Sequence, residues 1–212
     1  QEQCSVVGLA RGHLLKKEGI GAVGDSRRET LPFRALLRRN DDEAWEEAMA
    51  VVDCSGTYAP ETAQRSGSGG LSAPGEARAE ALGLVSRVIP SPGSFKGKRV
   101  AVLGGGFSAI TTIRKLADEN VEVVWLVRKA ESEAPYQRLE EDPLPQRDAL
   151  AAYGNGLASL GTSGSLKCIR GARIQRIDVV HKTLKLTLTN ETVVEADHLV
   201  SLTGYRPNAD LD

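Results

Sequence analysis

A run of small residues, Gly104-Gly105-Gly106-Phe107-Ser108-Ala109, carries the clearest chemical signal in this sequence. Gly104, Gly106 and Ala109 stand at the fixed positions of a GxGxxA pattern. In a dinucleotide-binding turn the first glycine permits a tight turn, the second lets the backbone approach a pyrophosphate, and the third small residue allows the helix to pack closely on the sheet. The free N–H groups and positive dipole end of the helix then face the phosphates. The run therefore predicts a phosphate-binding turn whose six residues are candidate ligand-binding residues.

The segments on either side of these glycines have the patterns needed to position them. An apolar run, Val100–Leu103, leads into the turn, and a second run, Val121–Val127, closes the unit. The apolar residues between them fall on one helical face; they are Ala109, Ile110, Ile113, Leu116 and Ala117. The stretch Lys98–Lys129 thus has the strand–turn–helix–strand order and the roughly 30-residue length of a dinucleotide-binding βαβ unit. The alternative, which this context disfavours, is a βαβ unit that binds no nucleotide.

The end of the second apolar run predicts the cofactor. In an NAD-binding unit this strand usually ends in a carboxylate that accepts a hydrogen bond from the ribose 2′-OH, but here it ends in Arg128 and Lys129. A guanidinium can pair bidentately with a 2′-phosphate and stack on adenine. We therefore expect NADPH rather than NADH, with Arg138 as a weaker second contact. The alternative is that Arg128 is only a solvated cation at the end of a strand.

Composition limits the other possibilities. The 212 residues carry 27 basic and 28 acidic side chains and 4% aromatic residues, which argues against a nucleic-acid partner. No apolar run approaches the ~18 residues of a membrane span, so we expect no membrane partner. We also expect no signal peptide, and we expect the protein to be cytoplasmic. Cys4, Cys54 and Cys168 form no CxxC and are expected to be buried thiols, without disulfide or zinc. Because the first residue is Gln1, the chain is interpreted as a cut or processed piece.

The N-terminal part of the chain has weaker patterns. Its expected elements are a strand at 4–9, a strand or helical turn at 32–37, a helix at 41–49 with Trp45 in a packing role, a buried strand at 50–52 and a helix at 77–88. The SGSGG run at 66–70 is read as a flexible loop, because no strand leads straight into it and no helix follows. A phosphate cradle there is the disfavoured alternative.

The C-terminal part is more regular. Its expected elements are a loop over the cofactor side of the sheet at 130–147, a helix at 147–160, a small antiparallel meander at 172–179, 183–188 and 192–194, and a last strand at 196–202. His181 and His198 lack a second ligand at metal spacing, so no metal site is predicted.

The residues that follow two of the predicted strands, here called strand exits, resemble each other and suggest a family. One reads Asp53-Cys54-Ser55-Gly56 and the other Leu202-Thr203-Gly204. With the GxGxxA unit, they make the chain similar to flavoproteins with two dinucleotide-binding domains, such as thioredoxin-reductase-like enzymes and flavin-containing monooxygenases. In that group an NAD(P)H domain is inserted into an FAD domain, and each crossing strand tends to end in a Thr-Gly-like motif. The resemblance covers about residues 48–208 and implies that Thr203-Gly204 lies near the nicotinamide.

The resemblance implies an α/β fold: a Rossmann-like NAD(P)-binding domain with a small antiparallel β-meander, plus a partial N-terminal α+β flank. The expected domains are residues 1–94 (partial FAD-domain-like flank and linker), 95–204 (NAD(P)H-binding domain) and 205–212 (return to the flank). The glycines at 19, 21 and 24 are read as loop residues, so no FAD fingerprint is recognised near the start of the chain, and neither the Gly-Asp flavin motif expected after the Thr-Gly exit nor the CxxC is found. FAD is therefore expected in the full-length relative and not held by this chain, with the missing FAD-domain segments as partners.

The implied function is that of the NADPH-binding part of an FAD-dependent oxidoreductase, in which hydride passes from the nicotinamide to the flavin. Two alternatives stay open: a non-catalytic NAD(P)-binding or sensor module, and a freestanding NAD(P)-dependent dehydrogenase. Tyr153 has Leu157 four residues on instead of lysine, which counts against a short-chain dehydrogenase. No catalytic residue is assigned. The sequence leaves the substrate, the final electron acceptor and the oligomeric state undefined.

Overall fold

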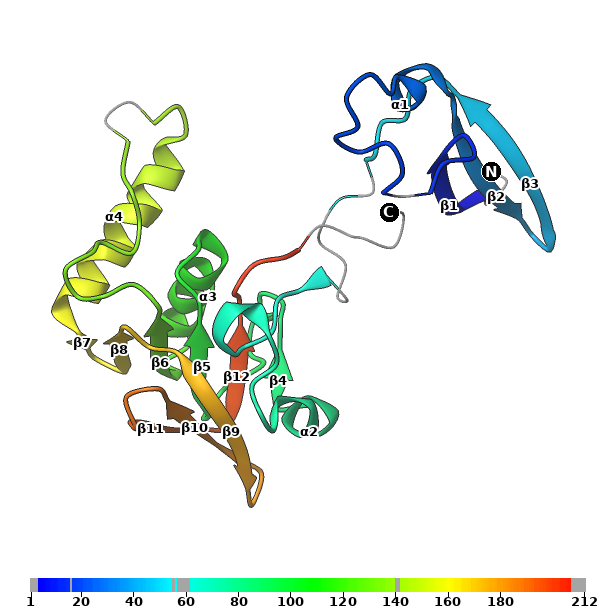
Figure 1. Ribbon diagram of the computed structural model, residues 1–212. Helices are drawn as coiled ribbons and strands as arrows, with labels where there is room; N and C mark the ends of the chain where they lie inside the picture. Colours follow the sequence, from blue (N-terminus) through cyan, green and yellow to red (C-terminus); the bar gives the residue numbers. More distant parts are fainter. Residues whose placement is uncertain (1–3, 16, 55, 57–61, 140–141, 207–212) are drawn as a thin grey trace. The chain divides into compact units, whose positions relative to one another are not determined.

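A computed structural model describes residues 4–15, 17–54, 56, 62–139 and 142–206. The chain divides into two compact units, Gln1–Thr62 with Arg206–Asp212 and Ala63–Tyr205 (Figure 1). Residues 63–94, which the sequence analysis assigned to the flank, lie in the same compact unit as the expected nucleotide-binding domain. The assignment of residues 1–62 to an FAD domain stays a prediction.

The first unit is built on a three-stranded antiparallel sheet in the order β1-β2-β3. Its elements are β1 (Cys4–Arg11), the short helix α1 (Arg27–Thr30), β2 (Phe33–Arg39) and β3 (Asp42–Ala48). Between β2 and β3 the chain turns at Asn40, whose φ of 55° lies in the left-handed region that asparagine tolerates. The strand predicted at 4–9 is therefore confirmed, and of the two alternatives at 32–37, a strand or a helical turn, the structure has the strand.

The helix predicted at 41–49 is wrong, because this segment is β3. The i,i+4 spacing of Trp45 and Met49 suggested a helix, but cross-strand partners decide the structure. Arginines of β2 face the acidic residues of β3, and the Arg34 guanidinium lies 4.7 Å from the centre of the Trp45 ring. Trp45 is 55% exposed and therefore not a core residue, although the Arg34 guanidinium packs over its ring.

Two further expectations for this unit are also corrected. Val51 and Val52 are exposed and outside any strand, so the buried strand predicted at 50–52 is not formed. Cys4 and Cys54 are exposed, and only Cys168 is a buried thiol as expected. In the first strand exit, Asp53-Cys54-Ser55-Gly56, Ser55 lies outside the described residues.

The second unit has a six-stranded sheet in the order β4-β12-β5-β6-β8-β7. Its strands are β4 (Val85–Ser86), β5 (Arg99–Leu103), β6 (Glu122–Val127), β7 (Thr162–Ser163), β8 (Leu166–Arg170) and β12 (His198–Ser201). Every neighbouring pair is parallel except β7 with β8. This sheet, with the helix between β5 and β6, confirms the Rossmann-like fold.

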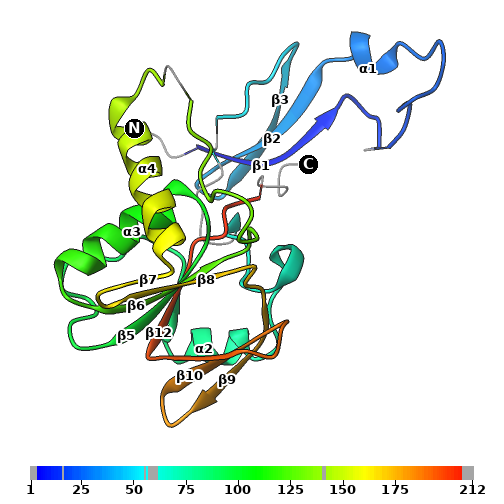
Figure 2. The same ribbon diagram turned by 90° about the vertical axis from the view of Figure 1, so that its left-hand side faces the viewer.

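Both faces of this sheet are covered, which explains why its strands read as continuous apolar runs. Helices α3 (Phe107–Asp118) and α4 (Pro145–Leu160) cover one face (Figure 2). Helix α2 (Glu76–Ala81) and the antiparallel strands β9 (Ile174–Val180), β10 (Thr183–Leu188) and β11 (Val193–Ala196) cover the other. Alternate strand residues enter the two cores: Val100 and Val102 pack with the helices, and Ala101 and Leu103 with the meander. The predicted meander and the helix at 147–160 are confirmed.

The helix predicted at 77–88 ends early. Helix α2 stops at Ala81, and Gly83, with a φ of 68°, lets the chain turn into β4 beside β12. Strand β8 was also not anticipated as a member of the parallel sheet. Its pattern alternates at first, with Leu166 and Cys168 buried and Lys167 exposed.

A buried carboxylate organises the segment before α2. The Glu76 side chain is 1% exposed, and it accepts hydrogen bonds from the backbone N–H groups of Ser66 and Ala73, at 3.1 and 2.9 Å. Arg87 balances its charge at 2.6 Å. The SGSGG run, which contains the 3₁₀ turn η2 (Ser68–Gly70), thus folds beside the chain's own carboxylate. Its reading as a loop holds, and an anionic ligand on these same N–H groups would have to displace Glu76.

Candidate dinucleotide-binding site

The glycine turn lies where β5 ends and α3 begins. The Gly104 N–H donates to the Leu126 carbonyl oxygen at 3.1 Å, and the Leu202 N–H donates to the Leu103 oxygen at 2.7 Å. Gly104 has a φ of 145°, and a Cβ added to it would lie 2.4 Å from the Leu202 oxygen. Glycine is required here because the turn passes directly against the exit of β12. Ala109 is fully buried, and its Cβ would lie 3.4 Å from a Cβ added to Gly104, so the two small fingerprint residues face each other across the turn.

Gly106 differs from Gly104 in its surroundings. Any residue can adopt its φ of −96°, and a Cβ added to Gly106 would meet no atom within 4 Å. The fold itself therefore does not require glycine at this position. The space in front of Gly106 lies at the N-terminus of α3, where no side chain caps the helix. This open, uncapped position fits a phosphate group that approaches the backbone.

Two aromatic side chains hold the carbonyl groups of the turn. The buried Trp125 indole donates from Nε1 to the Gly104 oxygen at 2.8 Å, and the Tyr136 hydroxyl donates to the Gly106 oxygen at 3.1 Å. Their rings are stacked, with centroids 6.3 Å apart. Sequence reasoning missed both contacts. The only available signal was an aromatic residue on the strand after the turn, since Tyr136 comes from a segment without periodicity.

The three cations predicted to contact the cofactor after β6 differ in their contacts. Arg128 is exposed and makes no hydrogen bond or ion pair with the described part of the chain. Lys129 donates from Nζ to the Ala134 oxygen at 3.1 Å. Arg138, the weaker candidate, pairs bidentately with Asp148 at 2.8 and 2.7 Å, and this bond lowers the pKa of Asp148. Arg128 is thus the cation of this group that a ligand could engage without breaking a described contact.

Thr203 and Gly204 lie at the same edge of the sheet as the glycine turn, because Leu202 contacts Gly104. The Thr203 hydroxyl donates to the Gln64 oxygen at 3.1 Å, and the Gln64 N–H donates to the Gly204 oxygen at 2.9 Å. These contacts hold the start of the second unit against the exit of β12. A contact of Thr203 and Gly204 with a nicotinamide stays a prediction.

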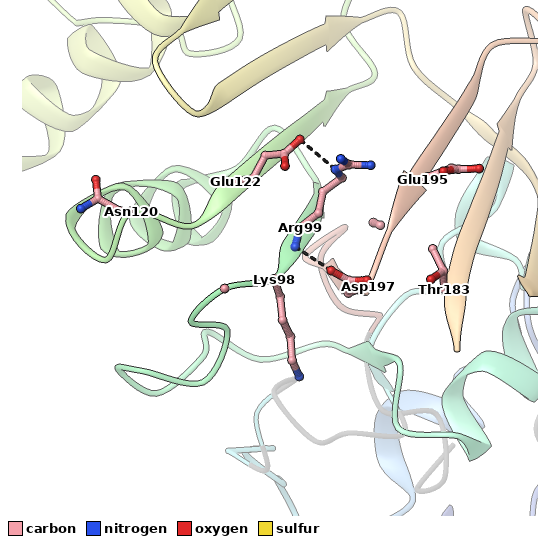
Figure 3. A pocket seen from close by; sticks show the side chains of 9 residues that line it. Lys98, Arg99, Asn120, Glu122, Thr183, Glu195 and Asp197 are labelled. Carbon is pink, nitrogen blue, oxygen red and sulfur yellow. Dashed lines mark hydrogen bonds and ion pairs between the residues drawn. The ribbon is translucent and has the colours of Figure 1, made fainter. Parts of the chain in front are cut away.

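A hollow of about 530 Å³ lies at the opposite edge of the sheet, where β5 and β6 begin (Figure 3). Its arginine and its acidic side chains already have partners. The Arg99 side chain pairs with Glu122 at 2.8 Å, and the Arg99 backbone N–H donates to Asp197 at 2.8 Å (Figure 3). Ligands of parallel α/β sheets bind at the carboxyl ends of the strands, so this hollow is not the expected site.

Three buried side chains in the second unit have shifted pKa values. Burial raises the pKa of the Cys168 thiol to about 11 and also raises the pKa of Tyr136. Burial, with a smaller effect of the nearby Lys98 charge, lowers the pKa of His198 to about 4. His198 contacts Ser86 Oγ at 3.0 Å, at the start of β12 and away from the glycine turn. Each group is therefore held in its neutral form inside the fold.

Within the described ranges, no cluster of three or more metal-ligating side chains is present. No helix in that part of the chain combines the length and apolar character that crossing a membrane requires.

A parallel sheet with a glycine turn between β5 and α3 defines a Rossmann-like dinucleotide-binding fold. The sequence matches the pyridine nucleotide-disulphide oxidoreductase family over residues 71–211, and the chain belongs to this family. This family confirms the resemblance to FAD/NAD(P)-dependent oxidoreductases that the motifs suggested. No curated protein matches the sequence.

Solved structures share the fold. The bacillithiol disulfide reductase Bdr (YpdA) from Bacillus cereus has 20% identity and a TM-score of 0.58, over 84% of this chain and 47% of that one. Thioredoxin reductase from Lactococcus lactis has 17% identity and a TM-score of 0.55, over 97% and 54%. The Kutzneria sp. 744 ornithine N-hydroxylase has 16% identity and a TM-score of 0.55, over 98% and 55%. The chain spans about half the length of each of these proteins.

Proposed function

We propose that the unit Ala63–Tyr205 is the NADPH-binding part of an FAD-dependent oxidoreductase. The observation that carries this proposal is the open space in front of Gly106 at the N-terminus of α3. Packing inside the fold does not require a glycine at this position. A ligand that needs the backbone at close range explains it. Membership of a pyridine nucleotide-dependent family supports the same ligand.

The residues of this edge have distinct roles in the proposal. We assign the pyrophosphate to the backbone N–H groups of Gly104–Ala109 and the 2′-phosphate to Arg128, with Lys129 adding positive charge beside it. Thr203-Gly204 is assigned to the nicotinamide end. When bound, the nicotinamide supplies a hydride for the flavin, and the protein supplies placement and electrostatics.

The FAD part of the proposal is based on solved structures of similar fold. The Kutzneria ornithine N-hydroxylase structure is of a complex with reduced FAD, NADP⁺ and L-ornithine. Within the described residues of the present chain, GxGxxA occurs once as a turn between a strand and a helix, and we assign that turn to NADPH. We therefore infer that FAD needs segments beyond those of this chain and that the isolated chain purifies colourless.

Cofactor selectivity tests the proposal. The dissociation constants of NADPH and NADH should be measured by calorimetry for wild type and Arg128→Glu, each at low and high salt. A charge-assisted, partly exposed contact predicts a preference for NADPH of about 10- to 100-fold. The substitution removes the attraction and repels the phosphate, so the preference should vanish or reverse. Higher salt should weaken NADPH binding more than NADH binding.

Arg114→Glu is the matched control. Arg114 is an exposed residue of α3 that makes no hydrogen bond or ion pair with the described residues, and the substitution changes the net charge equally. It should leave the NADPH-to-NADH ratio nearly unchanged. An equal effect of both substitutions would point to net charge instead of a specific contact. A ratio that Arg128→Glu does not move would remove Arg128 from the site.

A further inference from the structure

Tyr136 occupies an unusual position for a residue of an irregular segment. It lies between β6 and α4, yet it is 4% exposed and its ring packs against Phe107 and Trp125, with centroids 5.4 and 6.3 Å away. Its hydroxyl reaches back to the carbonyl oxygen of Gly106. One side chain thus connects the segment after β6 with the glycine turn before α3.

The surroundings fix this position from the side of α4. The Asn155 amide makes two hydrogen bonds with the Tyr136 backbone, accepting from its N–H at 3.0 Å and donating to its oxygen at 2.9 Å. Gly154 leaves room for the ring, because a Cβ there would lie 2.4 Å from Tyr136 Cε2. These contacts explain why α4 tolerates a glycine that should weaken a helix. Tyr136 is therefore held in place by the fold and does not merely fill a gap.

The orientation of the held carbonyl has a consequence for the next N–H group. The Gly106 oxygen accepts from Tyr136 and from the backbone N–H groups of Ala109 and Ile110, at 3.0 and 3.3 Å. In a planar trans peptide the C=O and N–H bonds point in opposite directions. The Phe107 N–H, which shares the peptide plane with the Gly106 carbonyl, must therefore point away from the helix and toward the open space. Trp125 acts in the same way on the peptide of Gly104 and Gly105.

We propose that Tyr136 is a positioning residue for the pyrophosphate: by holding the Gly106 carbonyl, it aims the Phe107 N–H at the ligand. This inference rests on the proposed function for its ligand. It separates two contributions to binding at the same edge of the sheet. Tyr136 should act on the pyrophosphate that NADPH and NADH share, whereas Arg128 should act only on the 2′-phosphate.

The test compares Tyr136→Phe with Tyr153→Phe. Tyr153 is 38% exposed on α4 and has no hydrogen bond to a described residue, so its substitution controls for the loss of a phenolic hydroxyl. Calorimetry should show Tyr136→Phe weakening NADPH and NADH by the same factor, about fivefold, as expected for one neutral hydrogen bond. The ratio of the two affinities should stay within about twofold of wild type. Tyr153→Phe should leave both affinities unchanged.

A second readout uses the ligand-free protein. In ¹H–¹⁵N spectra, the Phe107 amide resonance should shift and its hydrogen exchange should quicken in Tyr136→Phe, but not in Tyr153→Phe. Wild-type protein that binds neither dinucleotide contradicts the proposed function, and with it the ligand assigned here. Wild-type binding together with unchanged affinities or an unmoved Phe107 amide in Tyr136→Phe overturns this inference alone. A loss confined to NADPH overturns it as well, because Tyr136 would then serve the 2′-phosphate.

Discussion

Replacing the two fingerprint glycines one at a time should separate fold from binding. Gly104→Ala places a Cβ 2.4 Å from the Leu202 oxygen and forces alanine to a φ of 145°. The end of β12 must then move away from the turn. Backbone strain and overpacking of this kind cost about 2–4 kcal/mol in free energy of unfolding, or roughly 5–15 °C in the unfolding midpoint.

Gly106→Val should show the opposite behaviour. The backbone at Gly106 suits any residue and the added side chain meets no atom of the fold within 4 Å, so the stability change should stay below about 1 kcal/mol. The valine instead fills the space assigned to the pyrophosphate. The dissociation constant of NADPH should rise at least ~10-fold, which corresponds to about 1.4 kcal/mol.

Both variants can be measured in a Trp45→Phe background, where Trp125 is the one remaining tryptophan and its fluorescence reports unfolding of the second unit. Calorimetric titration with NADPH supplies the affinities. A Gly106→Val protein that is folded and binds NADPH like wild type would refute the assignment of this turn to phosphate. A Gly104→Ala protein as stable as wild type would show that the close approach to Leu202 is not rigid.

Two further predictions concern the stability of the second unit. Glu76→Gln should lower its free energy of unfolding by about 2–4 kcal/mol, because Arg87 loses its buried counter-charge, whereas the exposed control Glu131→Gln should change it by less than about 0.5 kcal/mol in thermal unfolding. His198 should make the protein less stable as pH falls from about 6.5 toward 4, since the unfolded state then binds a proton that buried His198 does not. Denaturant titrations should show a loss of up to about 3 kcal/mol over that range, and His198→Gln should remove most of the slope. Equal slopes in both proteins would exclude His198 as the cause.

The central βαβ unit was predictable because its signals are local. The glycine pattern, the apolar runs and the helical face lie within 98–129, and each agrees with the others. The meander was predictable for the same reason, since alternation with period two and turn residues define it. The helix predicted at 41–49 failed because its i,i+4 pair also fits one strand, and pairing with the arginines of β2 across the turn at Asn40 decides the structure.

The candidate site was predictable only in part. Spacing identified Gly104, Gly106 and Arg128, but not that Gly104 is required by the exit of β12, about 100 residues later. Tyr136 could not be found from sequence, because its segment has no period and its partners lie on three different elements. Contacts of this kind depend on tertiary packing, which a local pattern does not contain.

The most direct measurement of the central claim is a titration of the wild-type chain with NADPH followed in ¹H–¹⁵N spectra. The account predicts that the largest shifts fall on the amides of Gly105, Gly106, Phe107 and Ser108, and that NADH shifts the same amides with lower affinity. Shifts centred on the hollow at Arg99 and Asp197, or no shifts at millimolar NADPH, would contradict it.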